Sequence, residues 1–293
     1  MVRIMQGTII QGIAGFYYGR VEDKTVYECK ARGIFKKRGI SPAVGDKVDI
    51  SLTDEGKGVI EEIFPRKNIF IRPPIANIDC FIVVMAAAQP EPNFPVIDKF
   101  LVMADIHGTD IVVVVNKTDL ADEAQIEKIK DIYGSLYKLV FMSAKEKAGL
   151  EELEKLISGK TAAFAGPSGV GKSTILNALL PDANAETGNI SHKTRRGKHT
   201  TRHVEIFEAE GGGYIYDTPG FTSFDILETD EDELDIHFPE MAEYKGQCYF
   251  DNCRHLKEPS CAVRDALAEG KIHPMRYKSY EVQISEIREK KKY

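Results

Sequence analysis

The sequence predicts a multidomain protein with an N-terminal all-β barrel, a central α/β domain and a small, mostly helical C-terminal domain. Three observations support this division. Short β-prone runs separated by turn signals fill the N-terminal part, strand-like and helix-like patterns alternate through the middle, and three of the five cysteines gather near the C-terminus. A chain of 293 residues is long enough for two or three separate cores. We expect domains at residues 1–67, 68–228 and 229–293.

The composition, with 43% hydrophobic and 29% charged residues, is typical of a soluble globular protein. No apolar run approaches the roughly 20 residues that span a membrane, and the N-terminus lacks the apolar core of a signal peptide. We therefore expect a cytoplasmic protein with no membrane partner. The net charge of −6 argues against a uniformly basic nucleic-acid binder. Residues 1–77 are nevertheless basic, with 13 Lys and Arg against 9 Asp and Glu, and are the better candidate for meeting a phosphate backbone.

The N-terminal part has the strand spacing of a small barrel. Its β-prone runs include residues 7–10, 16–18, 25–29 and 47–50, with turn signals between them. Five short strands in about 65 residues favour an OB-fold. Residues 32–38 mix cations with an aromatic ring, which suits a groove where phosphates meet cations and bases stack. A solvated charged hairpin would explain the same composition. The candidates for RNA binding are Arg32, Phe35, Lys36, Lys37 and Arg38.

The central part alternates buried strands with amphipathic helices. After a proline-marked linker, continuous apolar runs at residues 79–86, 110–115 and 137–142 predict buried strands. Helical patterns follow each of them, at residues 94–107, 121–136 and 149–157. This alternation predicts a parallel sheet with helices on both faces.

A glycine-rich segment near the middle has the pattern of a phosphate-binding loop, G-x-x-x-x-G-K-S. A strand is expected before it at residues 161–165, and a helix after it at residues 174–180. The glycines let successive backbone N–H groups point at phosphate oxygens. Lys172 would reach the β- and γ-phosphates, and Ser173 would ligate Mg²⁺. The loop comprises Gly166, Pro167, Ser168, Gly169, Val170, Gly171, Lys172 and Ser173, followed by Thr174.

Four further short motifs resemble the nucleotide-contacting loops of GTPases. The carboxylate of Asp119 could accept hydrogen bonds from the ring N–H and 2-amino group of guanine, which adenine does not offer. The base-contacting loops are Asn116-Lys117-x-Asp119 and Ser143-Ala144-Lys145. Asp217-Thr218-Pro219-Gly220 resembles the loop that holds Mg²⁺ and senses the γ-phosphate, and Thr200 or Thr201 resembles the switch threonine. The expected Mg²⁺ ligands are therefore Ser173, Thr200 or Thr201, and Asp217.

These motifs occur in an unusual order. In an ordinary GTPase the phosphate loop comes first, whereas here both base-reading motifs precede it. The order predicts a circular permutation, which proteins tolerate where termini lie close together at the surface. One consequence is that the segment after Gly220 leads directly into the C-terminal part, so that ordering by the γ-phosphate could move that part.

Three cysteines and a histidine in the C-terminal part form the pattern C-x4-C-x-H-x5-C. Three thiolates and one imidazole are the ligands of a closed structural Zn²⁺ site, although the spacing differs from that of common zinc fingers. Such a site would stabilise a domain that is too small to bury much core. Buried thiols beside an unrelated histidine are the alternative. The candidates are Cys248, Cys253, His255 and Cys261.

The predicted barrel, the permuted motifs and the Cys/His cluster together resemble the ribosome small-subunit-dependent GTPase family RsgA, also called YjeQ or YloQ. The resemblance covers essentially the whole chain. It implies a cytoplasmic, GTP/GDP-binding bacterial enzyme that docks on the small ribosomal subunit late in its maturation, with rRNA contacts from the OB-fold and the zinc domain. It also favours the RNA-binding interpretation of residues 32–38. We expect the free chain to be a monomer.

Hydrolysis would proceed by in-line attack of water on the γ-phosphate, with Lys172 and Mg²⁺ stabilising the developing charge. Ras-like enzymes orient this water with a glutamine, but the corresponding residue here is Phe221. We therefore expect slow intrinsic hydrolysis, completed by a partner or another residue. His199 is the candidate, although a basic-loop histidine facing solvent or RNA is an equal alternative.

Two other functions stay open from the sequence. One is an RNA-binding nucleotide switch with negligible turnover. The other is a different P-loop enzyme that does not act on ribosomes, such as an ATPase or a kinase, which the Asn-Lys-Thr-Asp motif disfavours.

Overall fold

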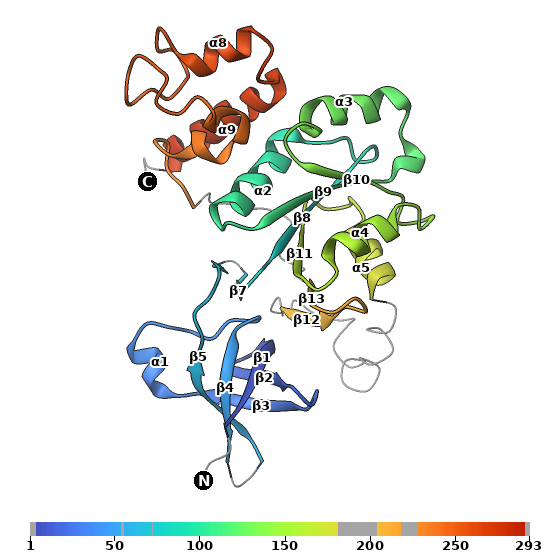
Figure 1. Ribbon diagram of the computed structural model, residues 1–293, viewed down its shortest axis with the longest axis vertical. Helices are drawn as coiled ribbons and strands as arrows, with labels where there is room; N and C mark the ends of the chain where they lie inside the picture. The colour runs from blue at the N-terminus through green and yellow to red at the C-terminus, as the bar shows by residue number, and fades with distance from the viewer. Residues whose placement is uncertain (1–3, 54–55, 72, 181–203, 218–227, 291–293) are drawn as a thin grey trace. The chain divides into compact units, whose positions relative to one another are not determined.

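The computed structural model describes residues 4–53, 56–71, 73–180, 204–217 and 228–290 (Figure 1). The chain forms two compact units, and each of them draws on three separate stretches of sequence. The first unit comprises Met1–Cys80, Glu154–Phe164 and Leu176–Gly220, and the second comprises Phe81–Leu153, Ala165–Ile175 and Phe221–Tyr293. Within the described part of the chain, no helix has the length and apolarity needed to cross a membrane.

The first unit contains a closed five-stranded barrel, in blue in Figure 1, as predicted for an OB-like domain. The strand order is β1-β2-β3-β5-β4, and β4 returns to β1. Closure depends on the length of β1, because its residues 4–8 pair with β4 and its residues 7–13 pair with β2, with a bulge between Ile9 and Gln11. The strands are β1 (Ile4–Ile13), β2 (Phe16–Val21), β3 (Val26–Ala31), β4 (Lys47–Leu52) and β5 (Gly58–Ile63).

The barrel sheet continues into strands from the centre of the sequence. Gln11 of β1 pairs with Glu205 of β12 (Glu205–Glu208), β12 runs antiparallel to β13 (Tyr214–Asp217), and β13 runs parallel to β11 (Thr161–Ala165). A short hairpin, β6 (Ile69–Phe70) and β7 (Ile75–Ala76), occupies the predicted linker. The barrel and the strand that precedes the phosphate loop are thus parts of one sheet.

The second unit is built on the strand order β10-β9-β8, with β9 and β10 parallel. β8 (Cys80–Ala86) is buried along its whole length, and β9 (Asp110–Asn116) along most of it, which explains their continuous apolar sequences. β10 (Lys138–Phe141) is shorter than predicted. The helices of the central part are α2 (Phe94–Ile106), α3 (Glu123–Tyr133), α4 (Leu150–Ile157) and α5 (Lys172–Leu179), with a 3-10 turn, η1 (Thr118–Leu120), before α3.

The C-terminal part, orange and red in Figure 1, is mostly helical, as predicted. Within the second unit it packs on α2, whose Val102 and Met103 share a core with Leu234, Phe238 and Tyr280. Its longest helix lies along α2. The elements are η3 (Leu234–His237), α7 (Pro239–Ala242), α8 (Ala262–Ala268) and α9 (Pro274–Lys290).

Candidate functional site

The phosphate loop connects the end of β11 to the first turn of α5, in the predicted order of strand, loop and helix. Lys172 is the first residue of the helix, and its Nζ donates to the carbonyl oxygens of Gly166 at 2.6 Å and Pro167 at 2.7 Å. The side chain therefore curls back over the loop. Burial lowers the pKa of Lys172 to about 8. A bound phosphate would give this ammonium an anionic partner in place of neutral carbonyls.

Two glycines of the loop have conformations and neighbours that exclude a side chain. Gly166 has a φ of 144°, and a Cβ there would lie 2.1 Å from the carbonyl oxygen of Val84. Gly171 has a φ of 97°, and a Cβ there would lie 2.2 Å from Nδ2 of Asn116. Glycine is needed at both positions for backbone conformation and for space.

Asn116 joins the phosphate loop to both base-reading loops. It ends β9 and is buried, and its Nδ2 donates to the carbonyl oxygen of Val170 at 2.8 Å. Its Oδ1 accepts from the backbone N–H of Ala144 at 3.0 Å. Beside it, the Ser143 hydroxyl donates to the Asp119 carboxylate at 2.6 Å. Segments far apart in the sequence thus form one connected site, and its polar side chains position one another.

The groups expected to contact nucleotide directly remain accessible. Asp119 and Lys145 are exposed, as are Ser173 and Thr174 at the start of α5, and Lys117 is half-buried. Lys117 donates to the backbone carbonyl oxygen of Gln89. Asp217 ends β13, in the first unit. The other predicted switch and catalytic residues lie outside the described part of the chain, namely His199, Thr200, Thr201, Gly220 and Phe221.

The basic segment of the barrel forms a helical turn, α1 (Gly33–Lys37), rather than a hairpin. Phe35 is only 6% exposed and packs in the barrel core with Ile9 and Val48. Most of the ring therefore belongs to the barrel core, although Phe35 also lines the neighbouring hollow, and its stacking on a base stays a prediction. Arg32 pairs with Glu61 at 2.9 Å. A hollow of about 790 Å³ lies beside the turn, and its lining includes Arg32, Arg38 and Arg66.

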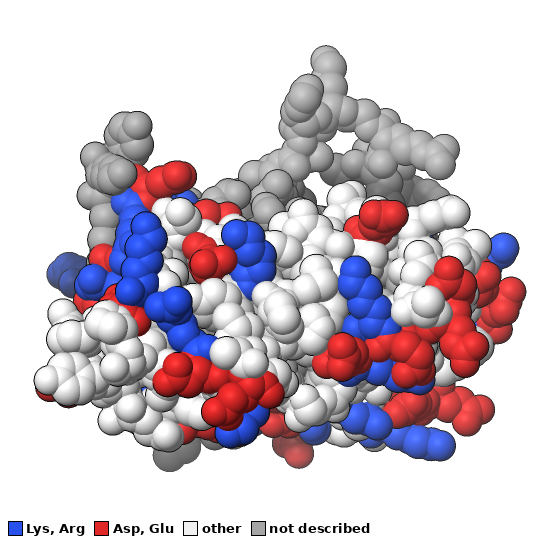
Figure 2. Space-filling view, turned by 90° about the horizontal axis from the view of Figure 1, so that it is seen from above, with Lys and Arg blue, Asp and Glu red and all other residues white. Residues whose placement is uncertain are grey.

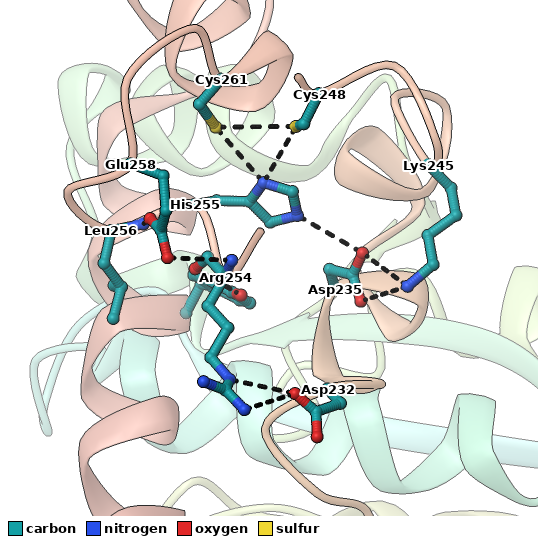
Figure 3. Close-up of polar contacts among 10 residues, drawn as sticks. Asp232, Asp235, Lys245, Cys248, Arg254, His255, Leu256, Glu258 and Cys261 are labelled. Atoms are coloured by element: carbon teal, nitrogen blue, oxygen red, sulfur yellow. Dashed lines mark hydrogen bonds and ion pairs between the residues drawn. The ribbon is translucent and has the colours of Figure 1, made fainter. Parts of the chain in front are cut away.

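The C-terminal cysteines and histidine converge on one point. Figure 3 shows Cys248, His255 and Cys261 of this group. Their four potential ligand atoms all lie within 4.8 Å of one another. Nδ1 of His255 is 3.5 Å from Sγ of Cys248 and 3.3 Å from Sγ of Cys261, and the two sulfurs are 3.9 Å apart. With Zn–N and Zn–S bonds of about 2.0 and 2.3 Å, tetrahedral geometry places N and S about 3.5 Å apart and two sulfurs about 3.8 Å apart. The donor set therefore fits a tetrahedral metal ion.

Burial also affects the protonation of the thiols in this cluster. Burial, and then the neighbouring thiols, raise the pKa of Cys261 to about 12. A metal must displace the thiol proton, so that binding and proton release are linked. Sequence reasoning did not identify Asp235, whose carboxylate faces the other nitrogen of His255, because no motif connects the two positions.

The strand–loop–helix unit, the connected base-reading loops and the early position of β9 and β10 in the chain define a circularly permuted P-loop GTPase. Residues 63–227 match the family model described as RsgA GTPase, and residues 6–60 match the one described as RsgA N-terminal domain. The chain belongs to the RsgA GTPase family and is a GTPase.

Individual relatives match along nearly the whole chain. A protein of Agathobacter rectalis is 45% identical, with 99% of this chain and 100% of the relative covered, and one of Alkaliphilus metalliredigens is 46% identical, with 98% and 99% covered. Both are named small ribosomal subunit biogenesis GTPase RsgA.

Solved structures show the same architecture. YjeQ from Thermotoga maritima superposes with a TM-score of 0.82 at 35% identity, covering 97% of this chain and 99% of that one. YloQ, described as a circularly permuted GTPase, superposes with a TM-score of 0.81 at 35% identity, covering 98% and 96%. The permuted order and the two flanking parts are thus common to this chain and its relatives.

Proposed function

We propose that this GTPase acts as a late maturation factor of the small ribosomal subunit, in which the GTP state controls docking on rRNA and the subunit stimulates hydrolysis. The nucleotide part rests on two hydrogen bonds of Asn116, which donates to the carbonyl oxygen of Val170 and accepts from the backbone N–H of Ala144, because they join phosphate and base recognition in one site. The ribosomal part is supported by full-length relatives at about 45% identity whose names state that role.

In this proposal guanine is selected by Asp119, which the Ser143 hydroxyl holds in place. Lys117, Ala144 and Lys145 would complete the base pocket. The loop from Gly166 to Thr174 would hold the phosphates. Mg²⁺, when bound, neutralises charge on the phosphate oxygens. Its proposed ligands are Ser173, Asp217 and Thr200 or Thr201.

Competition of GTP and ATP against a fluorescent GDP tests base selection. Asp119→Ala should lose most of the preference for GTP, whereas Asp131→Ala, an exposed carboxylate on α3, should keep it. Equal affinity of the unmodified chain for GTP and ATP would contradict the guanine assignment and favour another P-loop enzyme.

Subunit-stimulated hydrolysis tests the ribosomal role. Lys172 would stabilise the transition state through its positive charge. Turnover should rise strongly when small subunits are added, and His199→Ala should lose much of that rise while binding GTP normally. If small subunits leave the turnover of the chain unchanged, they do not regulate it. A His199→Ala variant with full stimulation would remove His199 from the mechanism.

For the metal centre we propose one structural Zn²⁺ held by Cys248, Cys253, His255 and Cys261, because four protein ligands leave no open position for catalysis. Metal analysis of the purified chain, with and without chelator, tests this directly. One equivalent of zinc whose removal lowers the melting temperature is expected. A chain that purifies without metal and does not respond to Zn²⁺ would contradict it.

For rRNA contact we propose Arg32, Lys36, Lys37 and Arg38, on or beside the exposed face of α1. Figure 2 shows one face of the molecule, where the described Lys and Arg side chains are interspersed with Asp and Glu. The net charge of −6 points to RNA contact through local basic groups rather than through a uniformly basic surface. Lys36→Ala with Lys37→Ala should weaken subunit binding and reduce its salt dependence. We place the protein in the cytoplasm as a free monomer, which sedimentation can test.

A further inference from the structure

The two ring nitrogens of His255 face different partners. Nδ1 lies toward the sulfurs of Cys248 and Cys261, whereas Nε2 lies 3.4 Å from the Oδ2 atom of Asp235 (Figure 3). The side chains of His255 and Asp235 are only 4% and 6% exposed. A neutral imidazole has one N–H, so if Nδ1 is a metal ligand the proton must be on Nε2, facing the carboxylate.

Asp235 is itself held in place. It lies in the short turn η3, and both of its carboxylate oxygens accept from Nζ of Lys245 at 3.1 Å. Lys245 follows α7 in the sequence. The carboxylate is therefore held by its own turn, η3, and by a lysine from a different segment. The contacts form a chain from Lys245 through Asp235 to His255 and on to the thiols.

The backbone of His255 is constrained as well. Its φ of 58° lies in the left-handed region, which is uncommon for a residue with a side chain. Two tyrosines of α9 hold this segment, since Tyr277 donates to the carbonyl oxygen of His255 at 2.5 Å and Tyr280 to that of Arg254 at 3.0 Å. A strained conformation persists only where the surroundings determine it, and here they aim the ring at the cysteines.

We propose that Asp235 is the positioning residue of the metal centre: it holds the ring of His255 in place and in the tautomer that presents Nδ1 to the metal. The inference rests on the proposed zinc site and adds a residue outside its ligand set. Outer carboxylates of this kind typically change metal affinity by about 10- to 100-fold.

The experiment uses the full chain, stripped of metal and titrated with Zn²⁺ against a chromophoric chelator, and then with Co²⁺. Asp235→Asn keeps the shape of the side chain but removes its charge. It should weaken Zn²⁺ binding by about 10- to 100-fold and alter the visible absorption bands of the Co²⁺ form. Lys245→Met should shift the affinity in the same direction by a smaller factor.

Asp232→Asn is the matched control. Asp232 is three residues away and pairs with Arg254, the neighbour of His255, at 2.6 Å, but it does not contact the ring. Its loss should leave Zn²⁺ affinity and the Co²⁺ spectrum unchanged. If an unmodified chain binds neither ion, the zinc site itself fails.

If the unmodified chain binds Zn²⁺ but Asp235→Asn and Asp232→Asn have the same Zn²⁺ affinity and Co²⁺ spectrum, the role of Asp235 is overturned. The same holds if Asp235→Asn lowers the stability of the metal-free and metal-loaded chains equally with no change in affinity. Should Asp235→Asn not fold, an unchanged affinity in Lys245→Met would overturn the proposal.

Discussion

The hydroxyl of Tyr216 donates to the carbonyl oxygen of Ala76 at 2.6 Å and also lies 3.0 Å from that of Val44. Tyr216 is fully buried and is the residue before Asp217, the predicted Mg²⁺ ligand. Gly45 makes the contact possible, since a Cβ there would lie 1.8 Å from the hydroxyl. The strand that carries a predicted switch residue is therefore bonded directly to the barrel and to the hairpin that follows it.

Replacing Tyr216 by Phe should destabilise the chain by about 1–2 kcal/mol, because the buried carbonyl oxygen of Ala76 loses this donor. Tyr214→Phe, a half-buried residue of the same strand, should cost less. As the chain has no Trp, urea unfolding is best followed by circular dichroism. Equal unfolding midpoints for the two variants would show that the hydroxyl contributes little.

Gly171→Ala should reduce GTP affinity by at least about tenfold, or ~1.4 kcal/mol, because the new Cβ meets Nδ2 of Asn116 and displaces the loop. Gly159→Ala is the control for backbone strain alone. Its φ is also positive, at 71°, but no atom lies within 4 Å of the added Cβ. Both variants should lose some stability, and only the first should lose nucleotide binding. Comparable GTP affinities, measured by fluorescence titration, would contradict the steric argument.

Nucleotide affinity should fall as pH rises above about 8, because burial sets the pKa of Lys172 in the free chain to about 8. Bound phosphates favour the ammonium and raise this pKa, so binding takes up a proton once the free lysine is neutral. Below pH 8 the lysine is already protonated, and its contribution is fully present. The decrease should be about fivefold between about pH 8 and about pH 9, and should approach tenfold per pH unit only above that range.

Lys172→Arg is the control for this titration, because a guanidinium stays protonated throughout the same range. The prediction does not concern the absolute GTP affinity of this variant relative to the unmodified chain. It is that the slope of log affinity against pH should be close to zero. Parallel slopes for the two proteins, measured by isothermal titration calorimetry, would assign the pH dependence to another group.

Arg276→Met should destabilise the second unit by about 3–5 kcal/mol. The guanidinium is fully buried, bonded to Asp98 of α2 and to Glu240 of α7 at 2.7 Å, and its loss leaves two buried carboxylates without a counter-charge. Arg288→Met, which removes a half-exposed partner of Glu231 from the same helix, should cost less than about 1 kcal/mol. Thermal and urea unfolding measure the stability of the two variants. Similar losses of stability would mean that the buried ion pairs of Arg276 do not determine the stability of this unit.

The course of α9 shows a limit of sequence patterns. Its apolar residues predict a helix only over residues 280–288, whereas the helix begins at Pro274. The buried face includes Arg276, Ser279 and Gln283 beside its aromatic and aliphatic residues, so hydrophobic periodicity is weak in its first half. A polar residue is predicted to face solvent unless its partners are known, and the partners of Arg276 lie in α2 and α7.

The sequence by itself determined the family, the order of the motifs and the members of the Cys/His cluster, because these depend on residues close together along the chain. Phosphate loop, guanine motif and cysteine cluster each place their chemistry within a few consecutive residues. Tertiary structure alone decided that Asn116 bonds to Val170, that Phe35 belongs to the barrel core, that Asp235 faces His255 and that Tyr216 reaches Ala76. Each of these depends on where distant segments meet, and a hydrogen bond or a buried contact is set by distance in space, which local sequence does not encode.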